Sequence, residues 1–168
     1  MDPSHISGVT INAGVITVST TRNKETDTSG KIICDLFKLH NIEVNHYEIV
    51  PDNKEEIIKS LKRALKKSNY IVFNGGTGIT PDDCTIEAIE PLFQKKLDGF
   101  GEYFRLKSFD DVGTRAVLSR ATAGIIDKKA VFCIPGSNAA VKLAMEKIIL
   151  KEASHIITHA GKPVEKNK

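Results

Sequence analysis

The feature that most limits the fold of this chain is an alternation of strand-like and helix-like segments over residues 14–73. Short β-branched or alternating stretches occur at "GVITVST" (14–20), "EVNHYEIV" (43–50) and "YIVF" (70–73). Amphipathic stretches separate them at 28–40 and 52–68. A strand, helix, strand, helix, strand order predicts parallel strands that are joined by right-handed crossovers.

Both helical stretches carry packing and capping signals. The first has Ser29 as a candidate N-cap, and its apolar residues share one face: Ile32, Ile33, Leu36 and Phe37. The second has an acidic start and a basic end, which suit the helix dipole. Its predicted buried residues are Ile57, Ile58, Leu61 and Leu65. The lysine-rich run 59–67 is then the solvated face of this helix.

The rest of the chain is less regular but keeps the same kinds of element. The segment "GFGEYFRLKSF" (99–109) is expected to be helical, and "LSRATAGIIDKKAVFCI" (118–134) predicts two strands joined by a polar turn at Asp127–Lys129. A loop and helix follow, with a last helix expected at 150–159. We therefore predict a single-domain, doubly wound α/β fold, with a mostly parallel sheet, helices on both faces and a small antiparallel hairpin. The predicted domain covers residues 13–160, and the predicted tails cover 1–12 and 161–168.

Composition excludes several classes of function. The 168 residues carry a formal net charge of +3 and no basic stripe interleaved with aromatics, so nucleic acid is not an expected partner. The apolar runs are too short to cross a membrane, and the first residues lack the pattern of a signal peptide. The cysteines (Cys34, Cys84 and Cys133) are widely spaced, which favours a reducing compartment over a disulfide framework or a zinc site. We expect a cytoplasmic protein.

The loop in "YIVFNGGTGITPDD" (70–83) follows a predicted buried strand. It contains Gly75, Gly76 and Gly78. Such glycines permit positive φ and let a ligand approach backbone N–H groups, as in anion cradles. Familiar templates do not match, because a P-loop needs a lysine and Pro81 stands where the dinucleotide motif needs its last glycine. The alternative is a tight turn before a helix, with Thr80 as N-cap and Asp83 at capping-box spacing.

Acidic residues at strand ends add a second signal. Asp82 and Asp83 beside a bound phosphate would repel it unless a divalent cation intervened, so glycines plus a carboxylate predict a site for a Mg²⁺-bound nucleotide. An acidic start of a helix is the alternative. Asp52 follows another predicted strand, although it and Asn53 are both candidates for the N-cap of the next helix.

A third strand end lies in "VFCIPGSNAAV" (131–141), where a helix starts near Ser137 or Asn138. Its free N–H groups could bind an anion, although this composition is also ordinary turn chemistry. Ligands of open α/β sheets bind outside the carboxyl ends of the strands. We therefore expect these loops to meet at one edge of the sheet.

In this order, the motifs resemble those of the molybdenum cofactor biosynthesis proteins of the MoaB and MogA type. They are "VPD" (50–52), "GGTG" with the following Asp-Asp (75–83), "LSRATAG" (118–124) and "PGSN" (135–138). "DTSG" (27–30) and "GFGEYFR" (99–105) are similar to further family segments, and the resemblance covers residues 14–160. It implies a doubly wound fold and a homotrimer or homohexamer. It also implies adenylylation of molybdopterin, in which Mg-ATP gives AMP to the terminal phosphate and pyrophosphate is released.

The resemblance assigns catalytic roles to Asp52 and Asp83, with Asp83 also contacting Mg²⁺ through bound Mg-ATP. It assigns the binding of ATP and molybdopterin to Ser19, Gly75, Gly76, Thr77, Gly78, Ser119, Arg120, Gly136, Ser137 and Asn138. For Arg120, as for Arg105, a surface ion pair is the alternative. The segment "VSTTR" (18–22) departs from the family, in which Ser-Asp often follows the first strand. If that acid binds metal or nucleotide, nucleotide affinity is reduced here.

Other interpretations stay open. The chain could be a catalytically silent molybdopterin-binding protein or, since the competence-damage family shares this domain, a nucleotide pyrophosphatase. The resemblance also implies a transient contact with the molybdenum-insertion protein. His155 and His159 have a metal-ligand spacing, but an ordinary helix end is favoured because no third ligand is evident. Cys84 lies beside Asp83, and a buried thiol is favoured over a nucleophile.

Overall fold

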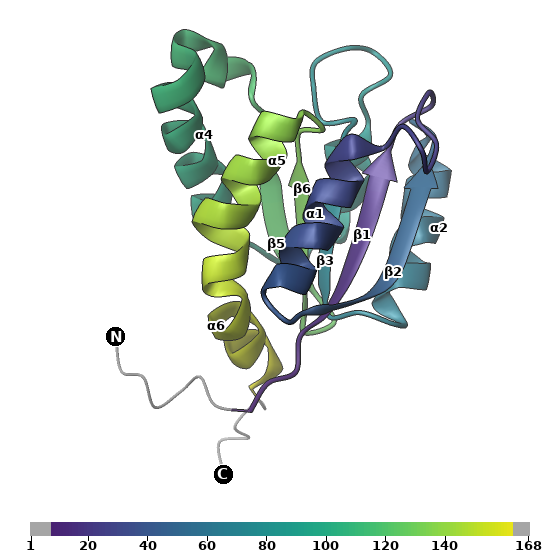
Figure 1. Cartoon of the computed structure of the whole chain (residues 1–168), viewed down its shortest axis with the longest axis vertical. Coiled ribbons are helices and arrows are strands. Elements are labelled where there is room, and N and C mark those ends of the chain that lie inside the picture. Colours follow the sequence, from purple (N-terminus) through teal and green to yellow (C-terminus); the bar gives the residue numbers. More distant parts are fainter. Residues whose placement is uncertain (1–7, 163–168) are drawn as a thin grey trace.

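A six-stranded sheet forms the centre of the computed structural model, which describes residues 8–162 (Figure 1). The strands are β1 (Asn12–Val18), β2 (Glu43–Val50), β3 (Tyr70–Asn74), β4 (Lys95–Lys96), β5 (Thr122–Ile126) and β6 (Lys129–Ile134). They lie in the order β2-β1-β3-β6-β5-β4. The first four in this order are parallel, and β5 pairs antiparallel with both β6 and β4. The predicted fold class is therefore confirmed.

The predicted hairpin joins β5 to β6 through a two-residue turn. Asp127 and Lys128 have φ of 47° and 63°, and Ile126 pairs with Lys129. Positive φ at both central residues is what a tight hairpin with the twist of the flanking strands requires. Because β5 runs antiparallel to β6, the start of β5 lies beside the end of β6. The segment that precedes β5 therefore lies at the edge of the sheet where β3 and β6 end.

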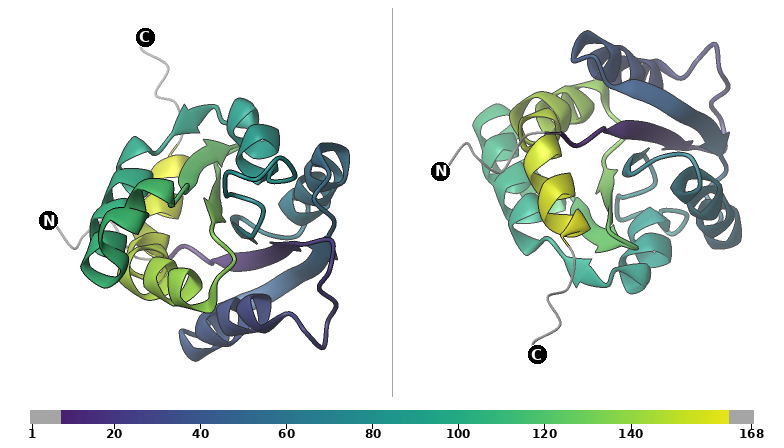
Figure 2. Two further views of the ribbon diagram at one scale, coloured as in Figure 1. Left: turned by 90° about the horizontal axis from the view of Figure 1, so that it is seen from above. Right: turned by 90° about the horizontal axis from the view of Figure 1, so that it is seen from below.

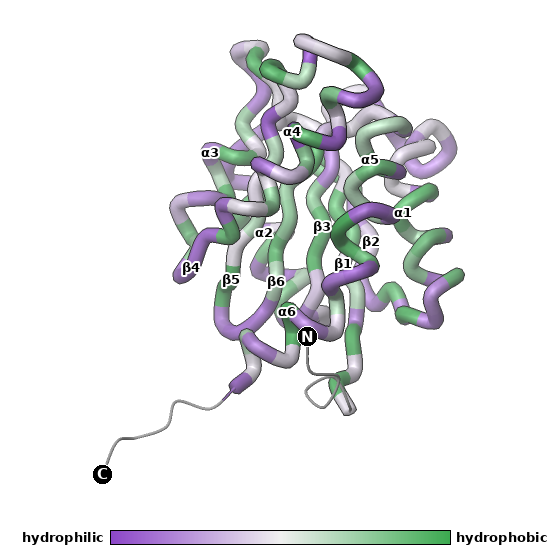
Figure 3. The backbone as a smooth tube through the Cα atoms, turned by 90° about the vertical axis from the view of Figure 1, so that its left-hand side faces the viewer, coloured by the Kyte–Doolittle hydropathy of each residue, from purple (hydrophilic) through white to green (hydrophobic). Residues whose placement is uncertain are grey.

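Helices cover both faces of the sheet, as Figure 2 shows from above and below. On one face lie α1 (Thr28–Leu39), α4 (Asp98–Val112), α5 (Asn138–Ala144) and α6 (Leu150–Gly161). On the other lie α2 (Lys54–Leu65) and α3 (Thr85–Ile89). The strands alternate between the two cores, since Val15 and Val72 pack on the first face and Ile16 and Ile71 on the second. Their two-sided burial explains the hydrophobic colour of β3 and β6 in Figure 3.

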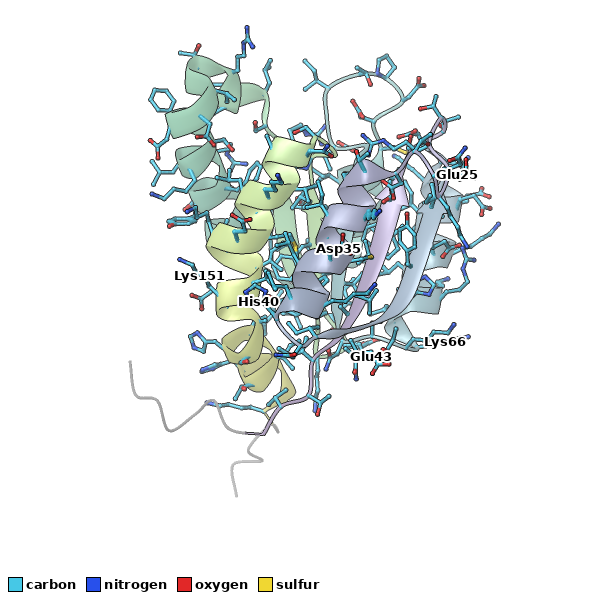
Figure 4. All side chains as sticks on the ribbon, in the orientation of Figure 1. Glu25, Asp35, His40, Glu43, Lys66 and Lys151 are labelled. Atoms are coloured by element: carbon cyan, nitrogen blue, oxygen red, sulfur yellow. The ribbon has the colours of Figure 1, made fainter. Side chains whose placement is uncertain are left out.

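Short non-α turns complete the chain. They are the 3₁₀ segments Glu90–Leu92 and Gly113–Leu118 and the π-helical turn Met145–Ile149. The π-helical turn joins α5 to α6, so the predicted last helix at 150–159 continues a helical run that begins at Asn138. Charged side chains such as Glu25, Lys66 and Lys151 project from the periphery (Figure 4). No helix in the described range 8–162 is long and apolar enough to cross a membrane.

The helix starts differ from the predictions in two details, at α1 and after Thr80, and at α2 the structure selects one of the two predicted cap candidates. Asp27, not Ser29, caps α1, because its carboxylate accepts a hydrogen bond from Gly30 N–H and Ser29 is buried. α2 begins at Lys54 with Asn53 as its cap. No α-helix begins directly after Thr80, because α3 starts only at Thr85. The predicted capping box is half formed, since Thr80 N–H donates to the Asp83 carboxylate. The predicted tails lie mostly outside residues 8–162.

Candidate functional site

The strand order reverses between β1 and β3, and a cavity lies where these two strands and β6 end. β1 is followed by β2 on one side, whereas β3 lies on its other side. Such a switch point leaves a crevice at the carboxyl ends of the strands. The cavity there has a volume of about 690 Å³, which suits a small organic ligand. In Figure 1 this edge is the upper end of the sheet.

Most residues that the sequence assigned to the site meet on this cavity. Its lining includes Ser19, Asp52, Gly75, Gly76, Thr77, Gly78, Asp83, Ser119, Arg120 and Gly136. Ser137 and Asn138 do not line it. Ser137 is the N-cap of α5, and the Asn138 side chain accepts a hydrogen bond from the Thr28 hydroxyl. The structure therefore gives these two residues a role in holding the loop after β6.

The glycine loop after β3 takes a conformation that larger residues resist. Gly75 and Gly76 have φ of 94° and 62°. An added Cβ on Gly75 would overlap the carbonyl oxygen of Val18, so β1 and the loop touch backbone to backbone. Thr85 holds the loop from behind, because its hydroxyl donates to Gly75 O (2.8 Å) and its N–H to Gly76 O (2.9 Å).

The same loop leaves backbone donors without partners. The N–H groups of Gly76, Thr77 and Gly78 have no hydrogen-bond acceptor within residues 8–162. Successive free N–H groups in a glycine turn form a concave site of positive potential. This loop can therefore accept an anionic group from the cavity.

Asp52 is free of the capping role that was its alternative. Asn53 accepts from the N–H groups of Glu55 (3.0 Å) and Glu56 (3.2 Å) instead. One carboxylate oxygen of Asp52 accepts from both the N–H and the hydroxyl of Thr20, each at 2.9 Å. The other oxygen faces the glycine loop, where a Cβ on Gly76 would lie 3.0 Å from it. Asp52 thus presents one free oxygen to the cavity.

Asp83 is held in a similar way. One of its oxygens accepts from the N–H (2.9 Å) and the hydroxyl (2.7 Å) of Thr80, and the other has no partner in the described part of the chain. Its neighbour Asp82 is exposed and does not line the cavity. No group of three or more His, Cys, Asp or Glu within residues 8–162 could hold a metal by itself. Two carboxylate oxygens are too few for a Mg²⁺ site made by protein alone. They suit a Mg²⁺ ion that is also bound to the phosphates of a ligand.

Arginines supply positive charge to the cavity. Arg120 donates to Gly78 O (2.9 Å), which ties it to the glycine loop, and it also forms with Glu87 the surface ion pair that was the alternative to a binding role. Arg115 lines the cavity and has no hydrogen-bond or ion-pair partner in the described range. Arg105 lies instead in an adjoining pocket between α4 and β5, which Arg120 also lines.

Sequence reasoning missed Arg22 and Asp27. Arg22 lines the cavity and contacts Asp27, whose carboxylate is fully buried, at 3.5 Å. Burial raises the pKa of Asp27, but hydrogen bonds from Thr17, Tyr47 and Gly30 and the charge of Arg22 outweigh it, so the pKa lies below its usual value. "DTSG" at a helix start is a capping pattern and was the available signal for Asp27. No local pattern marks Arg22.

His155 and His159 lie near the end of α6, as the favoured interpretation predicted, whereas Cys84 is half-buried and not the buried thiol that was predicted. The rings of His155 and His159 are edge-to-face with centroids 4.6 Å apart, and His155 lies 3.2 Å from Glu152. Burial, followed by the charge of Asp52, raises the pKa of Cys84. A raised thiol pKa lowers the thiolate fraction and argues against a nucleophile.

Comparisons with known proteins agree with this geometry. Residues 14–155 match the family model described as "Probable molybdopterin binding domain". Molybdenum cofactor biosynthesis protein B of Staphylococcus aureus (strain MRSA252) is 49% identical over 152 residues, which cover 88% of this chain and 90% of that protein.

Solved structures show the same likeness. A crystal structure of a molybdenum cofactor biosynthesis protein B superposes with a TM-score of 0.87 at 43% identity, covering 90% of this chain and 96% of that one. The tungsten cofactor synthesizing protein MoaB from Pyrococcus furiosus superposes with a TM-score of 0.85 at 44% identity, covering 93% and 100%.

Proposed function

This chain belongs to the molybdopterin-binding family of MoaB- and MogA-type molybdenum cofactor biosynthesis proteins, and we propose that it adenylylates molybdopterin. The observation that carries this proposal is the pairing of free carboxylate oxygens with free N–H donors on one cavity. Asp52 and Asp83 each present one oxygen, and the loop Gly76–Gly78 presents backbone donors. This combination suits a nucleotide polyphosphate with its cation.

The reaction joins two anions, so charge neutralisation and alignment dominate its barrier. A phosphate oxygen of molybdopterin attacks the α-phosphorus of ATP, the bond from that phosphorus to its bridging oxygen breaks, and pyrophosphate leaves with the electron pair. Mg²⁺ carried by ATP supplies positive charge at the phosphates, and Asp52 and Asp83 are the residues that would hold it. The N–H groups of the glycine loop orient the phosphates with fixed dipoles. No general base is needed, because a phosphate ester is already ionised near neutral pH.

The decisive assay is pyrophosphate release from Mg-ATP with and without molybdopterin. Asp83→Asn keeps an acceptor for Thr80 but removes the charge, and we expect turnover to fall by about 10²-fold or more. Asp82→Asn is the matched control, since Asp82 is adjacent, exposed and outside the cavity, and it should retain wild-type turnover. Near-normal turnover of Asp83→Asn would remove Asp83 from the mechanism.

A second candidate function is a silent molybdopterin-binding protein. It is favoured by Thr20, which stands where the family often has an acid and is hydrogen-bonded to Asp52. This candidate predicts molybdopterin binding without pyrophosphate release. A nucleotide pyrophosphatase would instead turn over ATP when no pterin is present. Pyrophosphate release with and without molybdopterin therefore separates the three candidate functions.

We also propose that the chain forms a homo-oligomer through an apolar surface on α4 and the following 3₁₀ turn. Its exposed residues are Leu106 (61%), Phe109 (57%), Val117 (80%) and Leu118 (57%). Exposed apolar side chains gathered on one surface are typical of protein interfaces. Phe109→Asp should shift the mass measured by light scattering towards the monomer. Leu39→Asp, which changes an isolated exposed leucine on α1, should not.

A further inference from the structure

We propose that Arg22 binds a phosphate group of the substrates, and that Asp27 is the positioning residue that holds its guanidinium at the cavity wall. The identity of that phosphate, on ATP or on molybdopterin, rests on the proposed function, but the anion site itself does not. The sequence motifs assigned no catalytic or binding role to either residue.

The guanidinium of Arg22 lies at the cavity wall with one donor unused within residues 8–162. Arg22 lies in the loop between β1 and α1, and its Nη1 donates to the Ser29 hydroxyl while its Nη2 donates to Gly136 O at 3.3 Å. It therefore bridges the start of α1 and the loop after β6. A guanidinium has five N–H donors in a planar fork. Its Nε–H has no acceptor within the described residues, and the side chain, 31% exposed, lines the cavity.

Arg22 is held from behind by Asp27, a buried carboxylate with several other donors. Asp27 accepts hydrogen bonds from Thr17 Oγ1 and Tyr47 Oη, both at 2.6 Å, and from Gly30 N–H at 3.1 Å. A helix cap needs only one of these bonds. A buried carboxylate is costly unless it is fully paired, and here neutral donors carry most of that pairing. Because several groups share its charge, Asp27 orients Arg22 at 3.5 Å without fully neutralising it.

Hydrogen bonds through Asn74 link this cluster to the glycine loop. The Ser29 hydroxyl donates to Asn74 Oδ1 (2.7 Å), and Asn74 Nδ2 donates to Thr17 Oγ1 (2.9 Å). Asn74 is the last residue of β3 and is followed directly by Gly75. The guanidinium and the free N–H groups of the loop are therefore fixed to one buried frame. Preorganised donors of this kind bind an anion without being reordered.

A purely structural role for Arg22, as a tie between two loops, makes different predictions from a binding role. Calorimetric titrations with Mg-ATP and, separately, with molybdopterin measure affinity without any turnover. Arg22→Ala should weaken the binding of one of these ligands by roughly tenfold to a hundredfold, the range for a charge-assisted hydrogen bond. Arg22→Lys should recover part of the loss. The ligand that is affected identifies the phosphate.

Arg63→Ala is the matched control, because it also removes a guanidinium but one that pairs with Glu48 on the surface. If the dissociation constants of both ligands change no more in Arg22→Ala than in Arg63→Ala, the proposed site is wrong. This outcome would leave adenylylation untouched. Conversely, an absence of turnover in the wild type would leave the binding result intact.

The positioning role of Asp27 is tested by a double-mutant cycle. Asp27→Asn should weaken the same ligand in the wild-type background but have little further effect in Arg22→Ala, since it acts through that side chain. Additive losses would overturn the positioning role. If Asp27→Asn does not fold, Tyr47→Phe, which removes one donor to the same carboxylate, takes its place in the cycle.

Discussion

Replacing Gly76 by alanine tests the strain in the glycine loop. Gly76 has φ of 62°, and an added Cβ would lie 2.5 Å from Thr85 Oγ1 and 3.0 Å from an oxygen of Asp52. Left-handed backbone costs a non-glycine residue about 1–2 kcal/mol. The Thr85 hydroxyl cannot move away without losing its 2.8 Å hydrogen bond to Gly75 O, which adds about 0.5–1.5 kcal/mol. We therefore expect a loss of roughly 1.5–3.5 kcal/mol in the free energy of unfolding.

Urea unfolding and thermal melting at one fixed protein concentration measure this loss, since the proposed self-association would make Tm depend on concentration. The expected fall in Tm is about 3–14 °C for a domain of this size. Gly99→Ala is the control, because Gly99 lies in α4 and an added Cβ there meets no atom within 4 Å. It should be neutral or stabilising by up to about 1 kcal/mol. Equal stability of Gly76→Ala and the wild type would refute the reasoning.

Three further predictions follow from single groups. The pKa of Asp27 is lower in the folded state than its unfolded value of about 3.9, so its contribution to stability is full above about pH 5 and is lost as pH falls below about 4. Asp27→Asn should flatten urea-unfolding stability in that window, and an unchanged slope would contradict this. Asn53→Ala should destabilise by about 1 kcal/mol in the same assay through loss of a cap. Burial raises the pKa of Cys133, so its thiol should react with Ellman's reagent only after unfolding, and later than Cys84.

The fold and the meeting of the motifs at one edge could be predicted because both follow from local patterns. Alternating segments predict parallel strands, and parallel strands place the loops that follow them at the same edge of the sheet. Asp52, Asp83 and the glycine loop come directly after strands, so their shared cavity needed no knowledge of side-chain packing. Their catalytic roles remain predictions.

Features that depend on pairing between distant segments could not be predicted in this way. Ser and Asp are both favoured N-cap residue types, so residue type alone does not choose between Ser29 and Asp27. The Ser29 hydroxyl instead donates to Asn74, which lies 45 residues away. Ser137 and Asn138 were both candidates for the start of α5; Ser137 accepts from Ala140 N–H there, whereas the Asn138 side chain accepts from Thr28, 110 residues away. Arg22 has no periodic or motif context, and only the buried carboxylate of Asp27 reveals its place.

The departure in "VSTTR" has a different meaning in the structure than in the sequence. An acid in place of Thr20 would put a second carboxylate beside Asp52 and repel it. Thr20 instead donates two hydrogen bonds to one oxygen of Asp52 and leaves the other facing the glycine loop. Neutral donors orient a carboxylate oxygen without themselves binding a cation. The departure therefore removes one potential metal ligand but orients another, so the presence of Asp52 alone does not decide between an active enzyme and a silent binding protein, and pyrophosphate release does.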